Sequence, residues 1–409
     1  MSEARTAVHV TGLGVVSPHG NDALAMFAAL MRGESAVRDV FPDLPKPAAA
    51  ATVAFDESPW FTKLQLAGVD RVSQIAVAAA TLAMQDANAP GQVAHERLGV
   101  YSGCGMGGAA ALETAYMNAL RGGRCPPLTV PAFMPNSPAG HIAMRLQAQG
   151  PVITYSVACA SSSVAIAEAA KAVRSGEVDV AIAGGSEALI VPGVVTAWQA
   201  MQTLAGFAPG ESARCCRPFD KGRSGFVLGE GAAFVVLESA AHARARGARV
   251  WAELAGSGIS CDATHLTKPD AAGQARAMRQ ALAMAGLAPA EVGYCNAHGT
   301  ATRLGDVAEA QALQLVWGDA LPDLRVSSTK ALHGHLLGAA GAMEAVITIL
   351  ALHQHQLPPN AHLDEADPEC ALPLVRGLQE AAPGLQAAVS SSFAFGGTNS
   401  VLAFRRAGG

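Results

Sequence analysis

Charged and aromatic residues are both scarce in this sequence of 409 residues. Asp, Glu, Lys and Arg together account for 15% and Phe, Trp and Tyr for 5%, whereas half of the residues are hydrophobic. A low charged fraction beside a high apolar fraction excludes an intrinsically disordered chain. The shortage of aromatic residues, together with 43 glycines, disfavours an aromatic-rich β-sandwich and favours closely packed helices with tight strand-to-helix turns. The length predicts two domains or one large duplicated unit.

Long runs of one kind of residue are absent as well. No basic run exceeds two residues and the net charge is −5, which excludes a nucleic-acid binder that depends on phosphate neutralisation. No apolar run reaches the roughly 18 residues of a membrane span. The longest, such as residues 346–352, suit a buried strand or helix. The N-terminus shows neither the apolar core nor the cleavage site of a signal peptide, so we expect a cytoplasmic protein with no membrane partner.

The eight cysteines include no C-x-x-C pair, so neither a disulfide framework nor a zinc knuckle is predicted. Most are expected to be small core residues. A disulfide between the adjacent Cys215 and Cys216 is disfavoured, because an unstrained bridge needs a different separation of the Cα atoms. The His-x-His pairs at residues 333–335 and 353–355 could be metal ligands, but neither has a carboxylate or a cysteine at ligand spacing nearby. We predict no metal.

Apolar strand patterns alternate with helical patterns along the whole chain. Strands are predicted at residues 8–17, 97–103, 151–159, 178–184 and 226–238, and again at 250–260, 292–297, 325–328, 387–393 and 399–404. Helices are predicted at residues 72–87, 160–175, 240–247, 271–285, 306–317 and 341–353, and Asn21 is expected to cap a helix that runs to Met31. This alternation predicts an α/β fold with mostly covered sheets. The similar order of elements in the two parts predicts a duplicated fold, with an N-terminal half at 1–247 and a C-terminal half at 248–409.

One cysteine stands between a predicted strand and a predicted helix, in Val157-Ala-Cys159-Ala-Ser-Ser-Ser163. At the start of a helix, unpaired backbone N–H groups and the positive end of the helix dipole favour the thiolate over the thiol. The small residues around Cys159 would leave room for a substrate to reach its sulfur. Cys159 is thus a candidate nucleophile, with a buried structural cysteine as the alternative interpretation.

Two histidines follow predicted strands and are flanked by glycine. His298 ends one strand and leads into a loop with Thr300 and Thr302, whereas Lys330 and His335 lie on a loop that leads into a Gly/Ala-rich helix. Loops at the ends of strands are where catalytic side chains gather in α/β folds. The two histidine loops therefore predict a site above one edge of a sheet.

A glycine turn follows the predicted strand at 387–393, in Phe395-Gly-Gly-Thr-Asn399. Backbone N–H groups in such a turn could point at a developing oxyanion. An ordinary glycine turn is the alternative.

Taken together, these motifs resemble the β-ketoacyl-[acyl-carrier-protein] synthases, most closely the elongating type II class. The resemblance covers essentially the whole chain. Besides the cysteine motif, both histidine motifs and the turn at 395–399, it rests on residues 10–20, 182–187 and 217–230, all in the same order. It implies a thiolase-like fold with two duplicated halves in a layered α/β/α/β/α arrangement.

The resemblance also implies a two-stage Claisen condensation. Cys159 would take an acyl group from a carrier-protein thioester, and malonyl-carrier protein would then lose CO2 and attack the acyl group. His298 and His335 would stabilise the enolate, and the backbone N–H groups of Cys159 and Phe395 would form the oxyanion hole. Phe395 also matches a gate to the acyl pocket. No cofactor is implied, because the phosphopantetheine arrives on the carrier protein.

Five further residues receive roles from the resemblance. Lys330 matches the lysine that sets the charge state of the site, with Glu344 on the next helix as its partner. Thr300 and Thr302 match the positions that hold the phosphopantetheine arm. Met106 matches the wall of the acyl pocket, where it could limit chain length, with plain core packing as the alternative.

The Cys–His–His set separates this chain from related enzymes. Starter-type synthases of this fold use Cys–His–Asn, whereas this chain has His335 in the third place. Degradative thiolases carry a second cysteine near the C-terminus, where this chain reads Ser392-Phe-Ala-Phe. Chain-length-factor subunits, which are non-catalytic partners, replace the nucleophile, whereas this chain keeps Cys159. A hydrolase that uses a Cys–His pair would need a Gly-x-Cys-x-Gly elbow, which this chain lacks. The resemblance therefore implies an active elongating synthase of fatty acid biosynthesis.

The resemblance implies an acyl carrier protein as a partner. It also implies a second subunit, because members of the family form homodimers. The basic residues that receive the carrier are few here, with Lys63, Arg71 and Arg124 as candidates, and Arg303 stands where the family often has proline. Drift of a solvated surface would explain this scarcity. The alternative is a heterodimer with a chain-length-factor-like subunit that supplies the basic face, in a type II polyketide or aryl-polyene pathway.

Overall fold

A ten-stranded sheet runs through the computed structural model, which describes residues 6–208 and 210–407. The strand order is β11-β10-β14-β15-β9-β1-β8-β6-β4-β5. The N-terminal half contributes β1 (Val8–Val16), β4 (Leu98–Gly103), β5 (Val152–Tyr155), β6 (Val180–Glu187) and β8 (Gly231–Ser239). The C-terminal half contributes β9 (Ala252–Cys261), β10 (Tyr294–Asn296), β11 (Arg325–Ser327), β14 (Ala387–Phe393) and β15 (Thr398–Arg406).

The two halves of the sheet have the same topology. In the first half β1, β8 and β6 pair antiparallel, and β6, β4 and β5 pair parallel. In the second half β9, β15 and β14 pair antiparallel, and β14, β10 and β11 pair parallel. A short antiparallel contact between β1 and β9 joins the halves at the centre. The predicted duplication is thus present, and the predicted division at 247 and 248 falls in the connection before β9.

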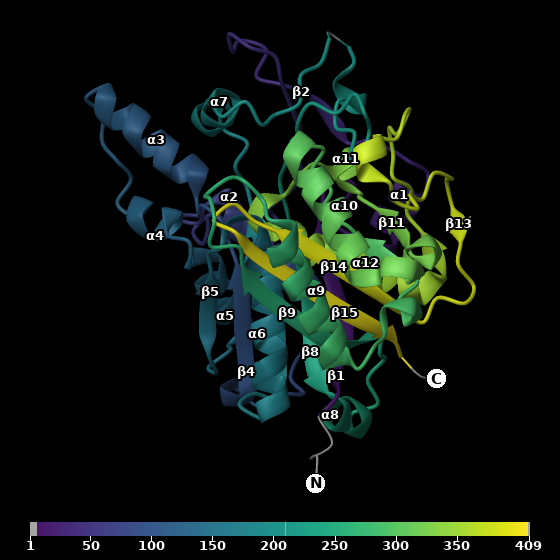
Figure 1. Cartoon of the computed structure of the whole chain (residues 1–409). Helices are drawn as coiled ribbons and strands as arrows, with labels where there is room; N and C mark the ends of the chain where they lie inside the picture. Colours follow the sequence, from purple (N-terminus) through teal and green to yellow (C-terminus); the bar gives the residue numbers. More distant parts are fainter. Residues whose placement is uncertain (1–5, 209, 408–409) are drawn as a thin grey trace.

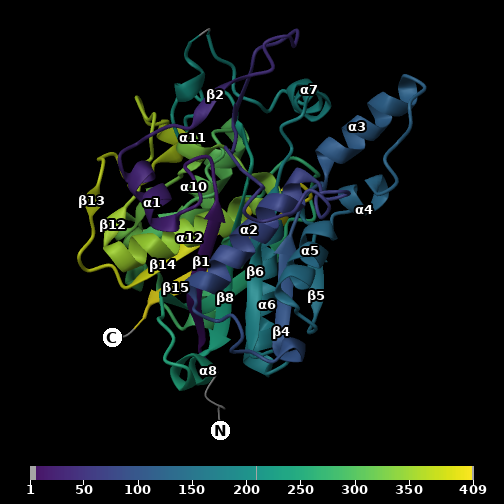
Figure 2. The same ribbon diagram turned by 180° about the vertical axis from the view of Figure 1, so that it is seen from behind.

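Helices form three layers around the two half-sheets. The N-terminal half is covered outside by α2 (Arg71–Asp86) and α5 (Ser137–Leu146), and the C-terminal half by α9 (Ala271–Ala285) and α10 (Arg303–Trp317). Between the half-sheets lie α6 (Ser161–Ser175) and α12 (Ala340–Gln354), which pack against each other. In Figure 1, α9 and α10 face the viewer, whereas Figure 2 shows α2 on the opposite side. Three separate apolar cores fill these interfaces, so the predicted five-layer α/β fold is confirmed.

The remaining elements surround this frame. The helices are α1 (Ala23–Met31), α3 (Ala109–Leu120), α4 (Thr129–Phe133), α7 (Pro192–Ala200), α8 (Ala240–Ala245) and α11 (Lys330–His333). The short strands are β2 (Val37–Val40), β3 (Ala48–Ala51), β7 (Leu228–Gly229), β12 (Gln356–Leu357) and β13 (Glu380–Ala381). Both views show α3 and α4 projecting from one side of the molecule (Figures 1 and 2).

The central helix α12 is apolar on all sides because protein surrounds it. Residues Leu337–Gln354 have the length and composition of a membrane span, yet 89% of that stretch is buried inside the molecule. A helix that packs between two half-sheets is buried on all sides and needs no polar face toward solvent. This stretch is therefore the core helix of the middle layer.

Two sequence predictions of local structure were wrong. The cap of α1 is Asp22, whose carboxylate accepts the N–H of Ala25 at 2.7 Å, and not Asn21. The strand predicted at 151–159 ends at Tyr155, because the Ser161 hydroxyl accepts the N–H of Val157 at 2.9 Å and the chain turns there. Cys159 consequently lies in a short 3-10 turn before α6 and not at the end of a strand.

Candidate active site

Cys159 lies in the tight turn at Ala158–Ala160, between β5 and α6. Ala158 has φ of +49°, an uncommon backbone conformation for a residue with a side chain. The hydroxyl of Ser161 holds the turn by donating to the Ala158 carbonyl at 2.6 Å. This turn places Cys159 at the start of α6 with its side chain 7% exposed.

The serines after Cys159 tie the layers together and do not open space for substrate. Ser162 Oγ accepts the N–H of Ala342 on α12 at 2.9 Å, and Ser163 Oγ lies 2.8 Å from Ser400 Oγ on β15. All three serines of the run are buried. The room expected for a substrate is therefore not beside these serines, since the cavity that reaches Cys159 is lined by other residues.

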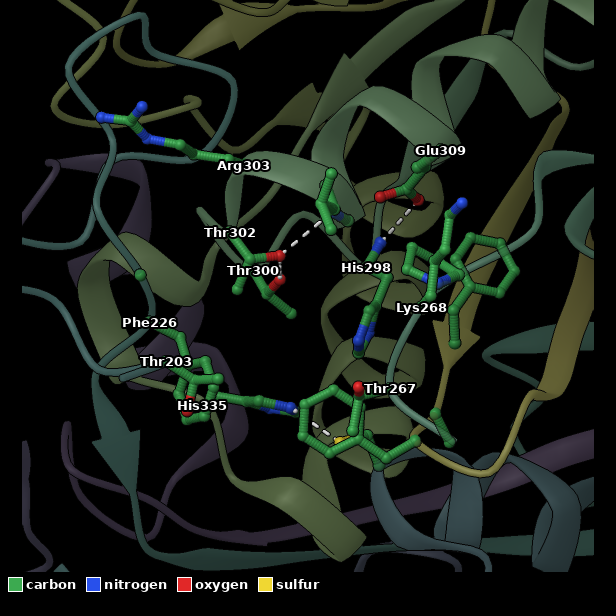
Figure 3. A pocket seen from close by; sticks show the side chains of 18 of the residues that line it. Thr203, Phe226, Thr267, Lys268, His298, Thr300, Thr302, Arg303, Glu309 and His335 are labelled. Carbon is green, nitrogen blue, oxygen red and sulfur yellow. Dashed lines mark hydrogen bonds between the residues drawn. The ribbon is translucent and has the colours of Figure 1, made fainter. Parts of the chain in front are cut away.

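His298 and His335 approach the sulfur from two loops of the C-terminal half. His298 follows β10, and its backbone N–H donates to Glu309 Oε1 on α10 at 2.8 Å. His335 follows α11 and is fixed to the segment before β7, since its N–H donates to the Val227 carbonyl at 2.7 Å. The two rings lie 5.4 Å apart at 82° (Figure 3).

The closest contact at the site joins Cys159 Sγ to His335 Nε2, at 3.1 Å. The backbone N–H of Leu337 points at His335 Nδ1 at 3.3 Å, which makes Nδ1 the acceptor. The ring proton therefore lies on Nε2, the nitrogen that faces the sulfur. His298 Nδ1 is buried and has no hydrogen-bond partner among the described residues. Both histidines can thus offer an N–H to a substrate oxygen.

Lys330 and Glu344 form a completely buried ion pair behind the histidines. Lys330 Nζ donates to Glu344 Oε1, and neither side chain has any exposed surface. Neither residue lines the cavity at the site. The Lys330 charge therefore acts through space, and it lowers the pKa of both His298 and His335.

Burial governs the protonation of the site. It holds the pKa of His298 and His335 well below the ordinary value of 6.5, with the Lys330 charge adding to the effect, so both imidazoles are neutral at pH 7. Burial also raises the pKa of the Cys159 thiol to about 12, although Lys330 and the Phe395 N–H both lower it. The thiolate expected at this helix start is therefore wrong for the resting site, where removal from water outweighs the helix dipole.

This protonation state gives a testable pH dependence. Alkylation of Cys159 by iodoacetamide should rise about tenfold per pH unit from pH 7 to 10, because the reactive thiolate stays a small fraction below a pKa near 12. The exposed Cys125 and Cys261 serve as internal controls for the reagent. Peptide mass mapping separates the three sites. A plateau at Cys159 by pH 8 would mean a preformed thiolate.

A cavity of about 480 Å³ leads from solvent to the sulfur. Thr300, Thr302 and Phe395 line it together with Cys159 and the two histidines. The Thr300 and Thr302 hydroxyls are 3.0 Å apart, and Figure 3 shows them beside His298. Most of the residues predicted for the site are thus brought together.

Phe395 is packed in an aromatic group at the inner end of this cavity. Its ring stacks on Trp198 with centroids 6.1 Å apart, and Trp198 meets Phe226 edge to face at 5.4 Å. Phe226 in turn meets the His335 ring at 5.4 Å. Trp198 and Phe226 were not predicted, because nothing local in the sequence marks a ring that packs against a distant one.

Met106 does not join this group. Its side chain is 52% exposed and does not line the cavity. Its backbone N–H donates to the buried Glu187 at 3.3 Å, which fixes the loop after β4. Within one chain, Met106 is therefore neither core packing nor a wall of the cavity.

Buried carboxylates hold the loops of the site, and the sequence interpretation missed them. Glu309 accepts the N–H groups of His298 and Gly299 at 2.8 and 2.7 Å, and Glu187 accepts that of Gly338 at 3.0 Å, close behind His335. Burial raises the pKa of Glu309 to about 8 and that of Glu187 to about 7. The only signal in the sequence was for Glu187, an acidic residue at the end of an apolar strand, whereas Glu309 lies on a helix with several other polar residues.

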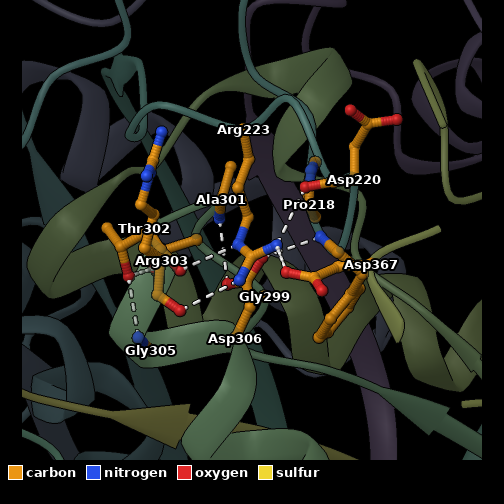
Figure 4. Close-up of polar contacts among 12 residues, drawn as sticks. Pro218, Asp220, Arg223, Gly299, Ala301, Thr302, Arg303, Gly305, Asp306 and Asp367 are labelled. Carbon is orange, nitrogen blue, oxygen red and sulfur yellow. Dashed lines mark hydrogen bonds and ion pairs between the residues drawn. The ribbon is translucent and has the colours of Figure 1, made fainter. Parts of the chain in front are cut away.

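A second cluster fixes the threonine loop (Figure 4). The Arg223 guanidinium donates to the carbonyls of Thr302 and Arg303 at 3.2 and 3.0 Å and forms an ion pair with Asp367 at 2.5 Å. Asp306 accepts the N–H of Ala301 at 3.1 Å. The cluster holds the start of α10 and with it the loop that carries His298.

The described residues contain one group that could ligate a metal ion, and it is the same Cys159, His298 and His335. Their ligand atoms lie within 4.8 Å of one another. However, the charge of Lys330 acts on all three groups, and the His335 nitrogen nearest the sulfur carries its proton. Both features disfavour a cation at this position.

A buried thiol, two neutral imidazoles and a backbone N–H directed at the sulfur make this a candidate site for acyl transfer through a cysteine. The chain belongs to the β-ketoacyl synthase family: the model of the N-terminal domain matches residues 5–243, and that of the C-terminal domain matches residues 251–364. It is a condensing enzyme, an acyltransferase (EC 2.3.1) of the 3-oxoacyl-[acyl-carrier-protein] synthase family.

Its relatives are similar along nearly the whole chain. Nodulation protein E of Rhizobium meliloti is 40% identical, with 98% of this chain and 99% of that protein covered. 3-Oxoacyl-[acyl-carrier-protein] synthase 2 of Staphylococcus aureus (strain COL) is 36% identical, with 99% of each chain covered.

Two solved structures show partners of such enzymes. The ishigamide ketosynthase/chain length factor is 32% identical with a TM-score of 0.92, and covers 99% of this chain and 100% of that chain. A type II polyketide acyl-carrier protein in complex with its ketosynthase contains a chain that is 29% identical, with a TM-score of 0.91 and the same coverage. Homologous ketosynthases thus bind acyl carrier proteins and chain length factors.

Proposed function

We propose that Cys159 is the nucleophile that accepts the acyl chain. Its sulfur attacks the carbonyl carbon of an acyl-carrier thioester, a new C–S bond forms, and the bond to the pantetheine sulfur breaks. The thiol proton of Cys159 passes to the leaving pantetheine thiolate. The N–H groups of Cys159 and Phe395 stabilise the tetrahedral oxyanion. The observation that carries this proposal is the 3.1 Å contact between Cys159 Sγ and a neutral His335.

In the second stage, His298 and His335 act on malonyl-carrier protein. Their N–H groups donate to the thioester oxygen, so that CO2 leaves and the electrons of the broken C–C bond form an enolate. The enolate carbon attacks the acyl carbonyl on Cys159, a C–C bond forms, and the C–S bond breaks. Cys159 leaves as a thiolate and takes up a proton from water. The product is a β-ketoacyl chain two carbons longer.

The remaining predicted residues support these steps. The Lys330–Glu344 pair keeps both histidines neutral, and Thr300 and Thr302 hold the phosphopantetheine arm in the cavity. Phe395 closes the inner end as a gate. Met106 can limit chain length only from a surface that a partner subunit covers, since it is exposed in the single chain.

The pathway has two candidates. Extension of fatty acids is favoured by the similarity to the Staphylococcus aureus enzyme over the full length. A ketosynthase subunit of a type II polyketide or aryl-polyene pathway is favoured by the fit to the ketosynthase/chain length factor structure. Either partner, an identical subunit or a chain-length-factor-like one, fits the exposed apolar side chains of α3 and of the edge strand β5, namely Tyr116, Met117, Leu120, Val152 and Ile153.

Acylation of the purified protein tests the proposal. Wild type, Cys159→Ala and the control Cys261→Ala are incubated with acyl carrier proteins of several chain lengths, with and without a chain-length-factor subunit, and weighed intact. We expect an acyl increment on wild type and on Cys261→Ala and none on Cys159→Ala. Acylation by long saturated chains without a partner supports fatty acid extension. Acylation only with the partner supports the second candidate, and none in either case contradicts the function.

A further inference from the structure

Glu187 is a buried carboxylate at the end of β6 that none of the proposed steps uses. Its Oε2 accepts the N–H of Gly105 at 2.8 Å and that of Gly338 at 3.0 Å. Its Oε1 accepts the N–H of Met106 at 3.3 Å and the thiol of Cys104 at 3.8 Å. One side chain therefore joins the loop after β4, in the N-terminal half, to the turn before α12, in the C-terminal half.

Both of these segments approach the carboxylate through a glycine. A methyl group added at Gly105 would lie 2.5 Å from Glu187 Oε2. One added at Gly338 would lie 2.5 Å from the same oxygen and 2.5 Å from the Gly105 nitrogen. Neither glycine has a positive φ, so the close approach, and not the backbone conformation, requires glycine at these positions. The two segments are thus packed directly on Glu187.

The turn that Glu187 holds also sets the ring of His335. Leu337 in this turn has φ of +46°, a conformation that residues with a side chain rarely adopt and that persists only where the surroundings hold it. It directs the N–H of Leu337 to His335 Nδ1, at 3.3 Å. The next N–H, that of Gly338, is the one bound to Glu187. The contact with Glu187 therefore fixes the turn one residue from the group that decides which ring nitrogen of His335 is protonated.

We infer that Glu187 is a positioning residue: by holding the turn at Leu337 and Gly338, it keeps the ring proton of His335 on Nε2. This inference rests on the proposed function, in which that N–H donates to the malonyl thioester oxygen. In a neutral imidazole, the hydrogen bond at one nitrogen decides which tautomer is present. If the Leu337 N–H turns away, the proton can move to Nδ1, and Nε2 then offers the oxygen a lone pair. Glu187 does not line the cavity, so it does not touch the substrate.

Two substitutions at Glu187 separate this role from that of its charge. Burial raises the pKa of the Cys159 thiol, and the charge of Glu187 adds to that effect, so the charge itself reaches the site. Glu187→Gln removes the charge, but its amide oxygen can still accept from Gly105 and Gly338, since the opposite orientation would set the NH2 group against both N–H groups. Glu187→Leu has a similar volume and no acceptor. The glutamine variant is therefore the matched control.

A second pair of variants tests the turn and leaves Glu187 in place. Gly338→Ala sets a methyl group against Glu187 Oε2 and the Gly105 nitrogen, and should push the turn away from the carboxylate. Gly140→Ala in α5 is its control, because the added methyl group meets no neighbouring segment within 4 Å. This pair keeps the inference testable if Glu187→Leu does not fold, which urea unfolding establishes for each variant.

Nitrogen-15 NMR of protein labelled in its histidine rings reads the tautomer directly. The His335 signals are identified as those missing from His335→Asn. In wild type, Glu187→Gln and Gly140→Ala, we expect Nε2 protonated and Nδ1 unprotonated. In Glu187→Leu and Gly338→Ala, the Nδ1 signal should move toward the position of a protonated nitrogen. Decarboxylation of malonyl-carrier protein should fall about tenfold or more in those two variants and stay within about threefold in the controls, because one of the two enolate donors is lost.

Each other result has a definite meaning. A folded Glu187→Leu with the wild-type His335 signals would overturn the inference and leave Glu187 as a residue of the fold alone. The same change of signals in Glu187→Gln as in Glu187→Leu would assign the effect to the charge, which also overturns it. A changed tautomer with unchanged decarboxylation would support the positioning of His335 by Glu187 and contradict the proposed function, in which His335 is a donor.

Discussion

Cys159→Ala should abolish condensation while leaving the decarboxylation of malonyl-carrier protein within about tenfold of wild type. Condensation should fall by about a thousandfold or more, because the covalent acyl intermediate cannot form. The adjacent hydroxyls cannot substitute for the thiol, since Ser161, Ser162 and Ser163 are buried and bound to other parts of the chain. Decarboxylation needs only the two histidines. Mass spectrometry of the carrier protein distinguishes malonyl, acetyl and β-ketoacyl products.

His298→Ala is the matched variant for this experiment. It should lose decarboxylation and condensation together by about a hundredfold or more, yet still become acylated at Cys159. Its backbone contact to Glu309 does not depend on the ring, so the loop should keep its position. If His298→Ala still decarboxylates at the wild-type rate, the histidine is not an enolate donor.

Lys330→Met should be the most destabilising of the single substitutions considered, at about 3–5 kcal/mol of unfolding free energy. It leaves Glu344 fully buried without its cation, and burial already raises the pKa of Glu344 to about 7. For an acid whose pKa is higher in the folded state than in the unfolded state, the contribution to the free energy of unfolding is fully present below the unfolded-state pKa. This contribution is lost as the pH rises through the folded-state pKa. The loss in Lys330→Met should therefore grow from pH 5 to pH 9. Urea unfolding at several pH values measures it.

A double variant separates stability from catalysis. Lys330→Met/Glu344→Leu removes both charges and should recover most of the unfolding free energy. It should not recover the rate, because the histidines lose the nearby charge that helps to keep them neutral. In the double variant, the decarboxylation rate should fall as pH drops toward 6. Full recovery of the rate would mean that the pair serves only stability.

Much of the fold could be predicted because its signals are local. The strand at 387–393 and the helix at 271–285 were predicted with the bounds that the structure shows, since a run of small or apolar residues without glycine or proline and a helical spacing need no distant partner. The cap of α1 was misplaced by one residue, because Asn21 and Asp22 are both good caps and only the turn geometry chooses between them. The projecting α3 was missed because it has few buried residues and so a weak pattern.

The residues of the site were likewise predicted where the signal is local and missed where it depends on distant segments. Cys159, His298 and His335 stand in recognisable motifs, and the structure brings them together. The protonation of Cys159 was misjudged, since a helix start is visible in the sequence whereas the burial of the thiol is not. Glu309 and Arg223 were missed because their partners are backbone groups of other segments. Met106 was misplaced within the single chain, because its surroundings depend on surfaces that one sequence does not encode locally.

The duplicated topology directs the positive ends of two helix dipoles at one cavity. Cys159 lies just before α6 and His335 just before α12, the equivalent helices of the two halves, so both helices direct their N-terminal ends at the same cavity. Each end carries about half a positive charge, which suits a site where a carboxylate, an enolate and an oxyanion occur in turn. An electropositive basin for anions therefore follows from the symmetry of the fold itself, before any catalytic side chain is considered.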